Sequence, residues 1–324
     1  MPILDEILHP VSEEMKLFEE NFRSSIKSKS LLLDFATNYI FRKKGKQIRP
    51  LFVFLSAKML GSVSESTYHA ASFIELLHTA TLIHDDVVDE SLERRGIFSI
   101  NALWKSKVAV LVGDYFLSRG LLLAVDHKEF DLLSIVSEAV REMSEGELLQ
   151  IYKSRKLNIT KEEYFEIIRK KTATLIGACT AAGARSVGAD AQTIELFKKF
   201  GENIGMAFQI KDDLFDYQKK GIIGKPTGND LKEKKITLPL IHALENGYTG
   251  DKNHIIRMIK SHHINSKKIQ EIIDFVIENK GIEYSVSKMN EFKDEALSLI
   301  RNYPDNDAKK SLFKLAEYVI TRDK

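Results

Sequence analysis

Residues 64–89 read SESTYHAASFIELLHTATLIHDDVVD, and this stretch decides the fold class. Its apolar residues recur three and four positions apart, which is the spacing of an α-helix, and Ser64 can cap the first free amides. The segment is apolar over much of its circumference, as in FIELL at 73–77. Helices of that kind are buried among other helices. We therefore expect a core helix over residues 65–89.

The same spacing continues through most of the chain. A second long apolar segment covers residues 190–218, with IGMAF at 204–208. Further helices are expected at 11–29, 31–42, 50–60, 107–125, 128–153, 160–187, 238–246, 251–263, 266–279, 282–302 and 304–321. No stretch alternates apolar and polar residues as a strand would, and no low-complexity linker divides the chain. The sequence therefore predicts an all-α protein that forms a single domain over residues 1–324.

Residue frequencies exclude several classes of protein. Of the 324 residues, 44% are apolar and 29% are charged, so a sizeable core can form. The 48 basic and 46 acidic side chains leave a formal charge of +2, which provides no broad basic field for nucleic acid. The lone Cys179 excludes a disulfide framework and a cysteine zinc site. No signal-peptide pattern and no apolar run near the ~20 residues of a membrane span are evident, so we expect a soluble, cytoplasmic protein.

Two acidic clusters share the pattern D-D-x-x-D. They are DDVVD at 85–89 and DDLFD at 212–216, and each follows strongly apolar sequence. On a helix, the three carboxylates of this pattern lie within an arc of about 100°, and such bunched charges cost free energy unless a cation is near. A solvated acidic face is the alternative for either cluster alone. The two clusters together favour Mg²⁺ held with a polyphosphate, because Mg²⁺ prefers oxygen ligands and shares its coordination with phosphates.

Candidate donors for a diphosphate lie near both acidic clusters. They are Lys46 and Arg49, His78, Arg94 and Arg95, Lys171 and Thr172, Gln209, and the loop lysines Lys225 and Lys235. Each has an ordinary alternative, such as a helix-end charge pair, a core histidine or a solvated face. As a set, they lie where one anionic ligand between two acidic helices would need them.

The motifs together resemble the trans-polyprenyl diphosphate synthase family. The matching stretches are GKQIRP from 45, HTATLIHDDVVDESLERRG from 78, KTA from 171, FQIKDDLFDY from 208 and GKPTGNDLKEKKITLPL from 224. They keep the family's order and spacing over nearly the whole chain. The resemblance implies the isoprenoid synthase fold, in which antiparallel helices surround a deep central cavity, and usually a homodimer.

This resemblance also assigns roles to single residues. Asp85, Asp89, Asp212 and Asp216 match ligands of two or three Mg²⁺ ions, and Asp86, Asp213 and Lys171 join them as catalytic candidates. Lys46, Arg49, His78 and Arg95 match positions that hold isopentenyl diphosphate. Arg94, Lys171, Thr172, Gln209 and Lys225 match positions that hold the allylic diphosphate, with Lys235 as a further candidate. The chain departs from the family at Lys44, where a Gly is usual, and at Gln47, where an Arg is usual.

The implied reaction is the 1'-4, head-to-tail condensation of isopentenyl diphosphate with an allylic diphosphate primer. Ala80 and Thr81 lie about 6–7.5 Å before Asp85 along the helix, and Leu77 lies one turn further back. In this family, bulky aromatics at such positions limit the product, so we expect a chain longer than C20, of about C30–C50. The loop at 219–235 is a candidate lid. The alternatives are a short-chain farnesyl or geranylgeranyl diphosphate synthase, a terpene cyclase, and a non-catalytic synthase subunit.

Overall fold

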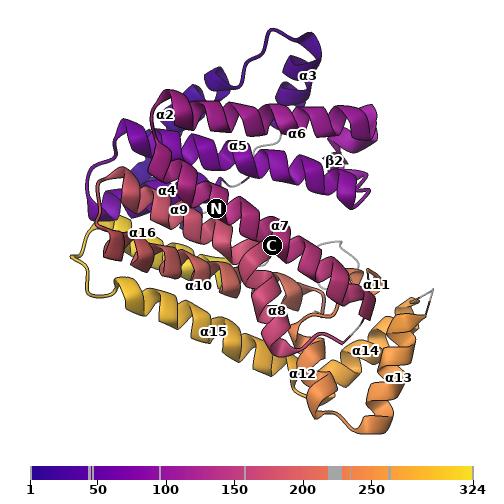
Figure 1. Cartoon of the computed structure of the whole chain (residues 1–324). Helices are drawn as coiled ribbons and strands as arrows, with labels where there is room; N and C mark the ends of the chain where they lie inside the picture. Colours follow the sequence, from indigo (N-terminus) through magenta and orange to yellow (C-terminus); the bar gives the residue numbers. More distant parts are fainter. Residues whose placement is uncertain are drawn as a thin grey trace. The chain divides into compact units, whose positions relative to one another are not determined.

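The computed structural model describes residues 2–42, 45, 47–94, 96–156, 158–217, 228–233, 235–261 and 264–322. Helices make up nearly all of its regular structure (Figure 1). Within the described part, the only strands are β1 (Glu93–Arg94) and β2 (Ile97–Phe98), which form one short antiparallel pair that the sequence did not predict. The all-α class that the sequence predicts is confirmed.

The helices follow one another with short connections. They are α1 (Pro2–Leu8), the 3-10 turn η1 (His9–Val11), α2 (Ser12–Ser25), α3 (Leu31–Ile40), α4 (Ile48–Leu60), α5 (Glu65–Val88), α6 (Ile100–Asp126), α7 (Phe130–Lys156), α8 (Lys161–Ile168), the π-helical turn η2 (Arg169–Ala173), α9 (Thr174–Ser186), α10 (Ala191–Phe215), α11 (Asn229–Lys232), α12 (Leu238–Asn246), α13 (Thr249–Lys260), α14 (Ser266–Glu278), α15 (Gly281–Ile300) and α16 (Asp307–Thr321). Most agree with the expected ranges to within a few residues.

The start of α6 differs from the expected start at residue 107. The helix begins at Ile100, where the side chain of Ser99 accepts from the N–H of Ala102 at 3.0 Å. It contains a kink at Lys105, whose φ of 65° is unusual for a residue with a side chain. The predicted segment is therefore the part of α6 that follows the kink.

Contacts between residues divide the chain into two compact units. Unit 1 comprises Met1–Val140, Ala178–Lys198 and Pro304–Lys314, and unit 2 comprises Arg141–Gly177, Lys199–Tyr303 and Leu315–Lys324. The first acidic motif therefore belongs to unit 1 and the second to unit 2. The single domain stays a prediction.

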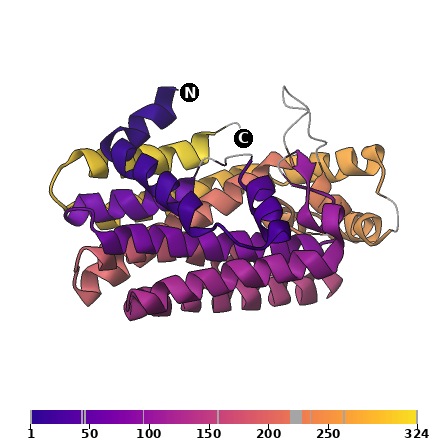
Figure 2. The same ribbon diagram turned by 90° about the horizontal axis from the view of Figure 1, so that it is seen from above.

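In unit 1, α5 and α6 lie side by side (Figure 1 and Figure 2). Two glycines of α6 allow this close approach. A Cβ on Gly113 would lie 2.2 Å from Nε2 of His84, and one on Gly120 would lie 3.0 Å from the ring of Phe73. Such distances exclude a larger side chain unless the side chains of His84 and Phe73 move. The helix that carries the first acidic motif is thus fixed tightly against its neighbour.

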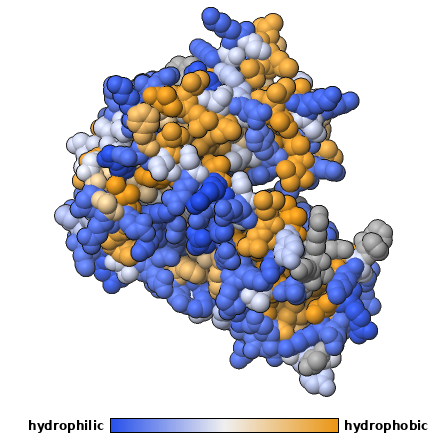
Figure 3. Space-filling view, viewed as in Figure 1, coloured by the Kyte–Doolittle hydropathy of each residue, from blue (hydrophilic) through white to orange (hydrophobic). Residues whose placement is uncertain are grey.

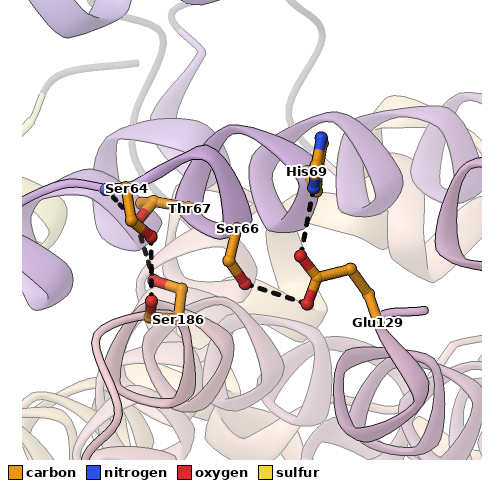
Figure 4. A network of polar contacts seen from close by, with 6 residues as sticks. All are labelled: Ser64, Ser66, Thr67, His69, Glu129 and Ser186. Carbon is orange, nitrogen blue, oxygen red and sulfur yellow. Dashed lines mark hydrogen bonds and ion pairs between the residues drawn. The ribbon is translucent and has the colours of Figure 1, made fainter. Parts of the chain in front are cut away.

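A polar network ties the beginning of α5 to other parts of unit 1. Figure 4 shows its members, which are Ser64, Ser66, Thr67, His69, Glu129 and Ser186. Ser64 donates from Oγ to the carbonyl of Ser186 at 2.9 Å, which links the start of α5 to the end of α9. One carboxylate oxygen of Glu129 accepts a hydrogen bond from Ser66 Oγ at 2.9 Å, and the other lies 3.0 Å from Nδ1 of His69. The end of α5 opposite the acidic motif is therefore anchored by hydrogen bonds.

In unit 2, α10 and the π-helical turn η2 approach each other closely. A Cβ on Gly205 of α10 would lie 2.5 Å from the Cα of Ala173. A π-helical turn holds one residue more than an α-helical turn, and such turns are frequent at functional sites. This contact places Lys171 and Thr172, which lie within η2, beside α10 and its acidic motif.

The helix α6 is long and apolar enough to cross a membrane, judged by length and composition alone. Core helices of soluble proteins meet the same criterion, and α6 packs along α5. Figure 3 shows apolar surface in the region of α3 and α6, to which exposed Leu111, Leu122 and Phe35 contribute.

Candidate functional site

The first acidic motif lies at the carboxyl end of α5, in unit 1. Asp85 is half-buried and Asp89 is exposed, whereas Asp86 between them is buried. The N–H of Asp89 donates to the carbonyl of Asp85 at 2.8 Å, so these two residues lie one helical turn apart. The outer carboxylates are available to a ligand, while the middle carboxylate belongs to the protein interior. The spacing had suggested that the three carboxylates share one exposed face. In the structure they do not, because the middle carboxylate is buried.

Both acidic motifs begin in the last turn of a helix. The carbonyl groups of such a turn already give that end partial negative charge, which favours a cation and disfavours carboxylates. Neither α5 nor α10 carries a basic residue in its last turn. Each motif therefore concentrates negative charge at a position where a cation from elsewhere must compensate it.

A cavity of about 970 Å³ lies beside the first motif within unit 1. Asp86 and His78 line it from α5, and Tyr39, Gln47 and Phe98 line it from other segments. His78 is buried, and Arg49 is half-buried near the beginning of α4. The cavity contains His78, one of the predicted isopentenyl diphosphate residues.

Four predicted binding residues cannot be placed. Lys46, Arg95, Lys225 and the side chain of Arg94 lie outside the described residues. Most of the predicted lid at 219–235 also lies outside them. Their roles stay predictions.

The second acidic motif lies at the carboxyl end of α10, in unit 2. Its middle residue, Asp213, is buried and accepts two hydrogen bonds, from Tyr164 Oη at 2.7 Å and from Gln209 Nε2 at 2.8 Å. Gln209 in turn accepts from Thr172 Oγ1 at 2.8 Å. Burial raises the pKa of Asp213 to about 7, although the hydrogen bonds from Tyr164 and Gln209 oppose the shift. Asp213 therefore orients Gln209 and Thr172, two predicted diphosphate residues, rather than facing solvent.

The outer residues of the second motif are more exposed. Asp212 pairs with Arg322, and Oδ2 of Asp216 accepts from the N–H of Asp230 at 3.0 Å. Burial and the charge of Asp216 raise the pKa of Asp230 to about 6. The sequence analysis missed Tyr164, Asp230 and Arg322. Only Asp230 carried a local signal, since it lies in the GNDLKEKK stretch that matched the family.

A second cavity, of about 710 Å³, lies within unit 2. Five predicted site residues line it, namely Lys171, Thr172, Gln209, Asp213 and Lys235, together with Tyr164 and Asp230. Lys171 pairs with Glu147 and donates to Oε1 of Gln150 at 3.3 Å. Lys235 pairs with Glu233 at 2.6 Å. The cavity thus gathers two ammonium groups, a hydroxyl and an amide beside one acidic motif, which are donors suited to an anionic ligand.

The predicted chain-length residues lie on α5. Leu77 and Ala80 are buried, and Thr81 is half-buried and donates from Oγ1 to the carbonyl of His78 at 2.9 Å. Leu77 faces α6, because a Cβ on Gly120 would lie 3.5 Å from its side chain. Phe116 of α6 is fully buried.

The residues present suit a divalent metal that binds together with a phosphorylated ligand. Among the described residues, no three His, Cys, Asp or Glu side chains gather closely enough to hold an ion alone. Each motif offers instead two outer carboxylates one turn apart, Asp85 with Asp89 and Asp212 with Asp216. Mg²⁺ is typically bound by one or two carboxylates, with water and substrate phosphates completing its coordination.

Cys179, the lone cysteine, has no place in such chemistry. It is fully buried, and burial raises the pKa of its thiol to about 12. A thiol with this pKa is not a nucleophile near neutral pH.

Comparisons with known proteins show the family of the chain. A family model described as polyprenyl synthetase matches residues 31–276. Over 321 residues, the chain is 32% identical to an octaprenyl diphosphate synthase of Haemophilus influenzae, covering 99% of this chain and 97% of that protein. A polyprenyl synthase from Caulobacter crescentus, solved with calcium and isoprenyl diphosphate, has a TM-score of 0.91 at 30% identity, covering 99% and 98% of the two chains. A geranylgeranyl pyrophosphate synthase from Bacteroides thetaiotaomicron has a TM-score of 0.85 at 35% identity, covering 99% and 100%.

Proposed function

This chain belongs to the polyprenyl synthetase family of prenyltransferases, and we propose that it condenses isopentenyl diphosphate with an allylic diphosphate into an all-trans product of about C30–C50. The resemblance drawn from the motifs is thereby confirmed at the level of the family. One observation carries the proposal. Two D-D-x-x-D motifs each begin in the last turn of a helix that has no basic residue there, so each motif concentrates negative charge at a position that favours a cation.

The second motif and its cavity suit the allylic diphosphate. Lys171 and Lys235 supply positive charge, while Thr172 and Gln209 supply directed hydrogen bonds. Buried Asp213 fixes the amide of Gln209, and Asp212 and Asp216 are left as outer ligands. Lys225 and Arg94, which lie outside the described side chains, stay predicted residues for the same substrate. We assign isopentenyl diphosphate to the first cavity, where His78 lies, with Arg49, Lys46 and Arg95 as its other binding residues.

The first motif divides its carboxylates in the same way as the second. Asp85 and Asp89 are the outer carboxylates, and we assign them to the metal. Asp86 and Asp213 are the two buried middle residues, and Asp213 holds the amide of Gln209.

The reaction then depends on electrostatics rather than on a protein nucleophile. When bound, two or three Mg²⁺ ions supply positive charge to the leaving diphosphate and favour ionisation of the allylic C–O bond. The cationic side chains bind the diphosphates and so orient the substrates for reaction. Exclusion of water from the site protects the allylic cation. A proton then leaves the condensed product, and the released pyrophosphate is the base we propose.

The product length follows from the side chains behind the first motif. Ala80 and Thr81 are small, and Leu77 lies one turn further from the carboxylates. Neither Ala80 nor Thr81 is an aromatic residue that would stop a growing prenyl chain at these positions of α5. We propose that the prenyl product grows beyond C20 until larger side chains, Phe116 among them, stop its growth.

The apolar outer face of α6 supports a homodimer. Leu111 is 65% exposed, and Val110, Leu121, Leu122 and Val125 are also exposed along the same helix. Exposed apolar patches of this kind mark interaction surfaces. Light scattering on the purified protein tests the dimer, and Leu111→Glu should shift it to a monomer. We assign the protein to the cytoplasm.

A turnover assay tests the proposed function. The purified protein is incubated with isopentenyl diphosphate, farnesyl diphosphate and Mg²⁺, and the products are separated by reversed-phase chromatography. We expect products longer than C20 that form only when Mg²⁺ is present. A C15 or C20 end product would identify a short-chain synthase. A hydrocarbon made without isopentenyl diphosphate would identify a terpene cyclase. Absence of any turnover would indicate a non-catalytic synthase subunit.

A further inference from the structure

The last described residue of the chain, Arg322, lies at the second acidic motif. It follows α16, and its N–H donates to the carbonyl of Tyr318 at 3.0 Å, so helical hydrogen bonding extends to it. Its guanidinium pairs with Oδ1 of Asp212. The side chain is only 13% exposed, although it lies two residues from the end of the sequence. This burial distinguishes the contact from an ordinary surface ion pair.

Two aromatic rings of α10 hold the guanidinium in place. Its central carbon lies 4.2 Å from the ring centre of Phe208 and 5.9 Å from that of Phe215. These distances are within the range of cation–π attraction. The Nε of Arg322 is buried without a hydrogen-bond acceptor in the described part of the chain. The side chain is thus positioned by charge and stacking, while its hydrogen bonding stays incomplete.

The position of Asp212 explains why a cation lies there. The carboxylate is in the last turn of α10, next to Asp213 and one turn from Asp216, and no basic residue belongs to that turn. Negative charge from the helix end and from these carboxylates accumulates at one place. A metal-free protein therefore needs another positive group at Asp212, and Arg322 is in contact with it.

We propose that Arg322 occupies the cation position at Asp212 before a divalent metal binds, and leaves this carboxylate when the metal arrives. The inference rests on the proposed function, in which Asp212 is a metal ligand. A guanidinium and a divalent ion at the same oxygen repel each other, so binding of one opposes binding of the other. Arg322 therefore weakens metal binding to the empty site. A diphosphate adds oxygen ligands of its own, and metal and diphosphate together displace the arginine.

Metal titration of the full chain tests this competition. Binding of Mn²⁺ alone is measured by electron paramagnetic resonance for the wild-type protein and for Arg322→Gln. We expect the dissociation constant for Mn²⁺ to fall about fivefold or more in the variant, because the competing cation is gone. Arg322→Lys keeps the charge and should stay close to the wild type. Lys293→Gln is the matched control, since Lys293 is 14% exposed and pairs with Glu317 at 3.0 Å in the same unit, and its affinity for Mn²⁺ should not change.

Thermal unfolding gives a second readout. In EDTA, Arg322→Gln should unfold at a lower temperature than the wild type, because Asp212 loses a compensating charge. Addition of Mg²⁺ with inorganic pyrophosphate should raise the melting temperature of the variant more than that of the wild type, since tighter binding to the folded state stabilises it more.

Three outcomes would contradict the inference. Unchanged or weaker Mn²⁺ binding by Arg322→Gln overturns the competition. Weaker binding of pyrophosphate in the presence of metal shows that Arg322 is a diphosphate ligand instead. Asp212→Asn separates the inference from the proposed function: if this variant binds Mn²⁺ as the wild type does, the metal role of Asp212 fails, and both proposals fail at that residue. If Asp212→Asn loses Mn²⁺ while Arg322→Gln is unchanged, only the inference on Arg322 is overturned.

Discussion

Replacing Tyr164 with Phe removes one hydroxyl from the hydrogen-bonded chain that connects α8, α10 and η2. The hydroxyl donates to Oδ2 of Asp213 at 2.7 Å, and both side chains are buried. Phe fills almost the same volume, so Tyr164→Phe leaves a buried carboxylate oxygen without its donor. A hydrogen bond to a charged group contributes about 1.5–3 kcal/mol to stability. For a chain of this length, we expect the melting temperature to fall by about 2–4 °C.

The loss should depend on pH. Because burial holds the pKa of Asp213 at about 7, the carboxylate is mostly ionised at pH 8 and mostly protonated at pH 6. The ionised form needs the hydroxyl donor more than the protonated form does. Tyr164→Phe should therefore destabilise the metal-free protein more at pH 8 than at pH 6, as measured by urea unfolding in EDTA.

The same substitution should impair the site without abolishing it. Asp213 accepts from Gln209, and Gln209 accepts from Thr172, so a carboxylate that shifts would misplace both side chains. We expect KM for the allylic diphosphate to rise several-fold, with KM for isopentenyl diphosphate nearly unchanged.

Tyr217→Phe is the matched control for Tyr164→Phe. The hydroxyl of Tyr217 is also buried, and it lies 3.1 Å from Oγ1 of Thr237, a neutral partner. Its loss should cost about 0.5–1.5 kcal/mol at both pH values. A destabilisation by Tyr164→Phe of less than about 0.5 kcal/mol, or one equal at pH 6 and pH 8, would refute the reasoning.

Four further predictions follow from residues in either unit. Ala80→Phe should shorten the product, because the ring would fill the space behind the first acidic motif; an unchanged chromatographic profile would contradict this. Gly205→Ala should destabilise the protein by about 1–3 kcal/mol, since the new methyl group would lie 2.5 Å from the Cα of Ala173, and chemical denaturation measures the loss. Cys179 should not react with a thiol reagent at pH 8 until the protein unfolds, since its pKa is about 12; absorbance of the released chromophore follows this. In EDTA, stability should rise as pH falls from 7 to 5, because the pKa of Asp213 is raised from 3.8 to about 7 and the folded state takes up a proton that the unfolded state does not. Asp213→Asn should remove this contribution, which approaches about 1.4 kcal/mol per pH unit.

Helix periodicity predicted most of the fold because buried helices carry apolar residues at regular spacing. The start of α6 could not be predicted in the same way. Its first turn precedes the kink at Lys105, and a positive φ at a lysine has no periodic signal in the sequence. The π-helical turn η2 was also not predicted, since a turn of five residues is too short to reveal a change of helical period in the sequence.

Some residues of the candidate site could also be predicted from the sequence, and others could not. Both acidic motifs were found because their residues are neighbours on one helix, and local spacing is enough to recognise them. Tyr164 and Arg322 were not found, because their partners Asp213 and Asp212 lie 49 and 110 residues away. Burial of the middle carboxylates was also not predictable, since it depends on how other helices pack against α5 and α10.

The wide turn at Arg169–Ala173 has a consequence for editing the gene. A π-helical turn is equivalent to an α-helical turn with one inserted residue. The insertion rotates the residues that follow by about 100° around the helix axis. Deletion of one residue from η2 would keep the segment helical but move Lys171 and Thr172 to another face of the helix. A scan of single-residue deletions through this turn should therefore yield a folded protein that no longer binds the allylic diphosphate.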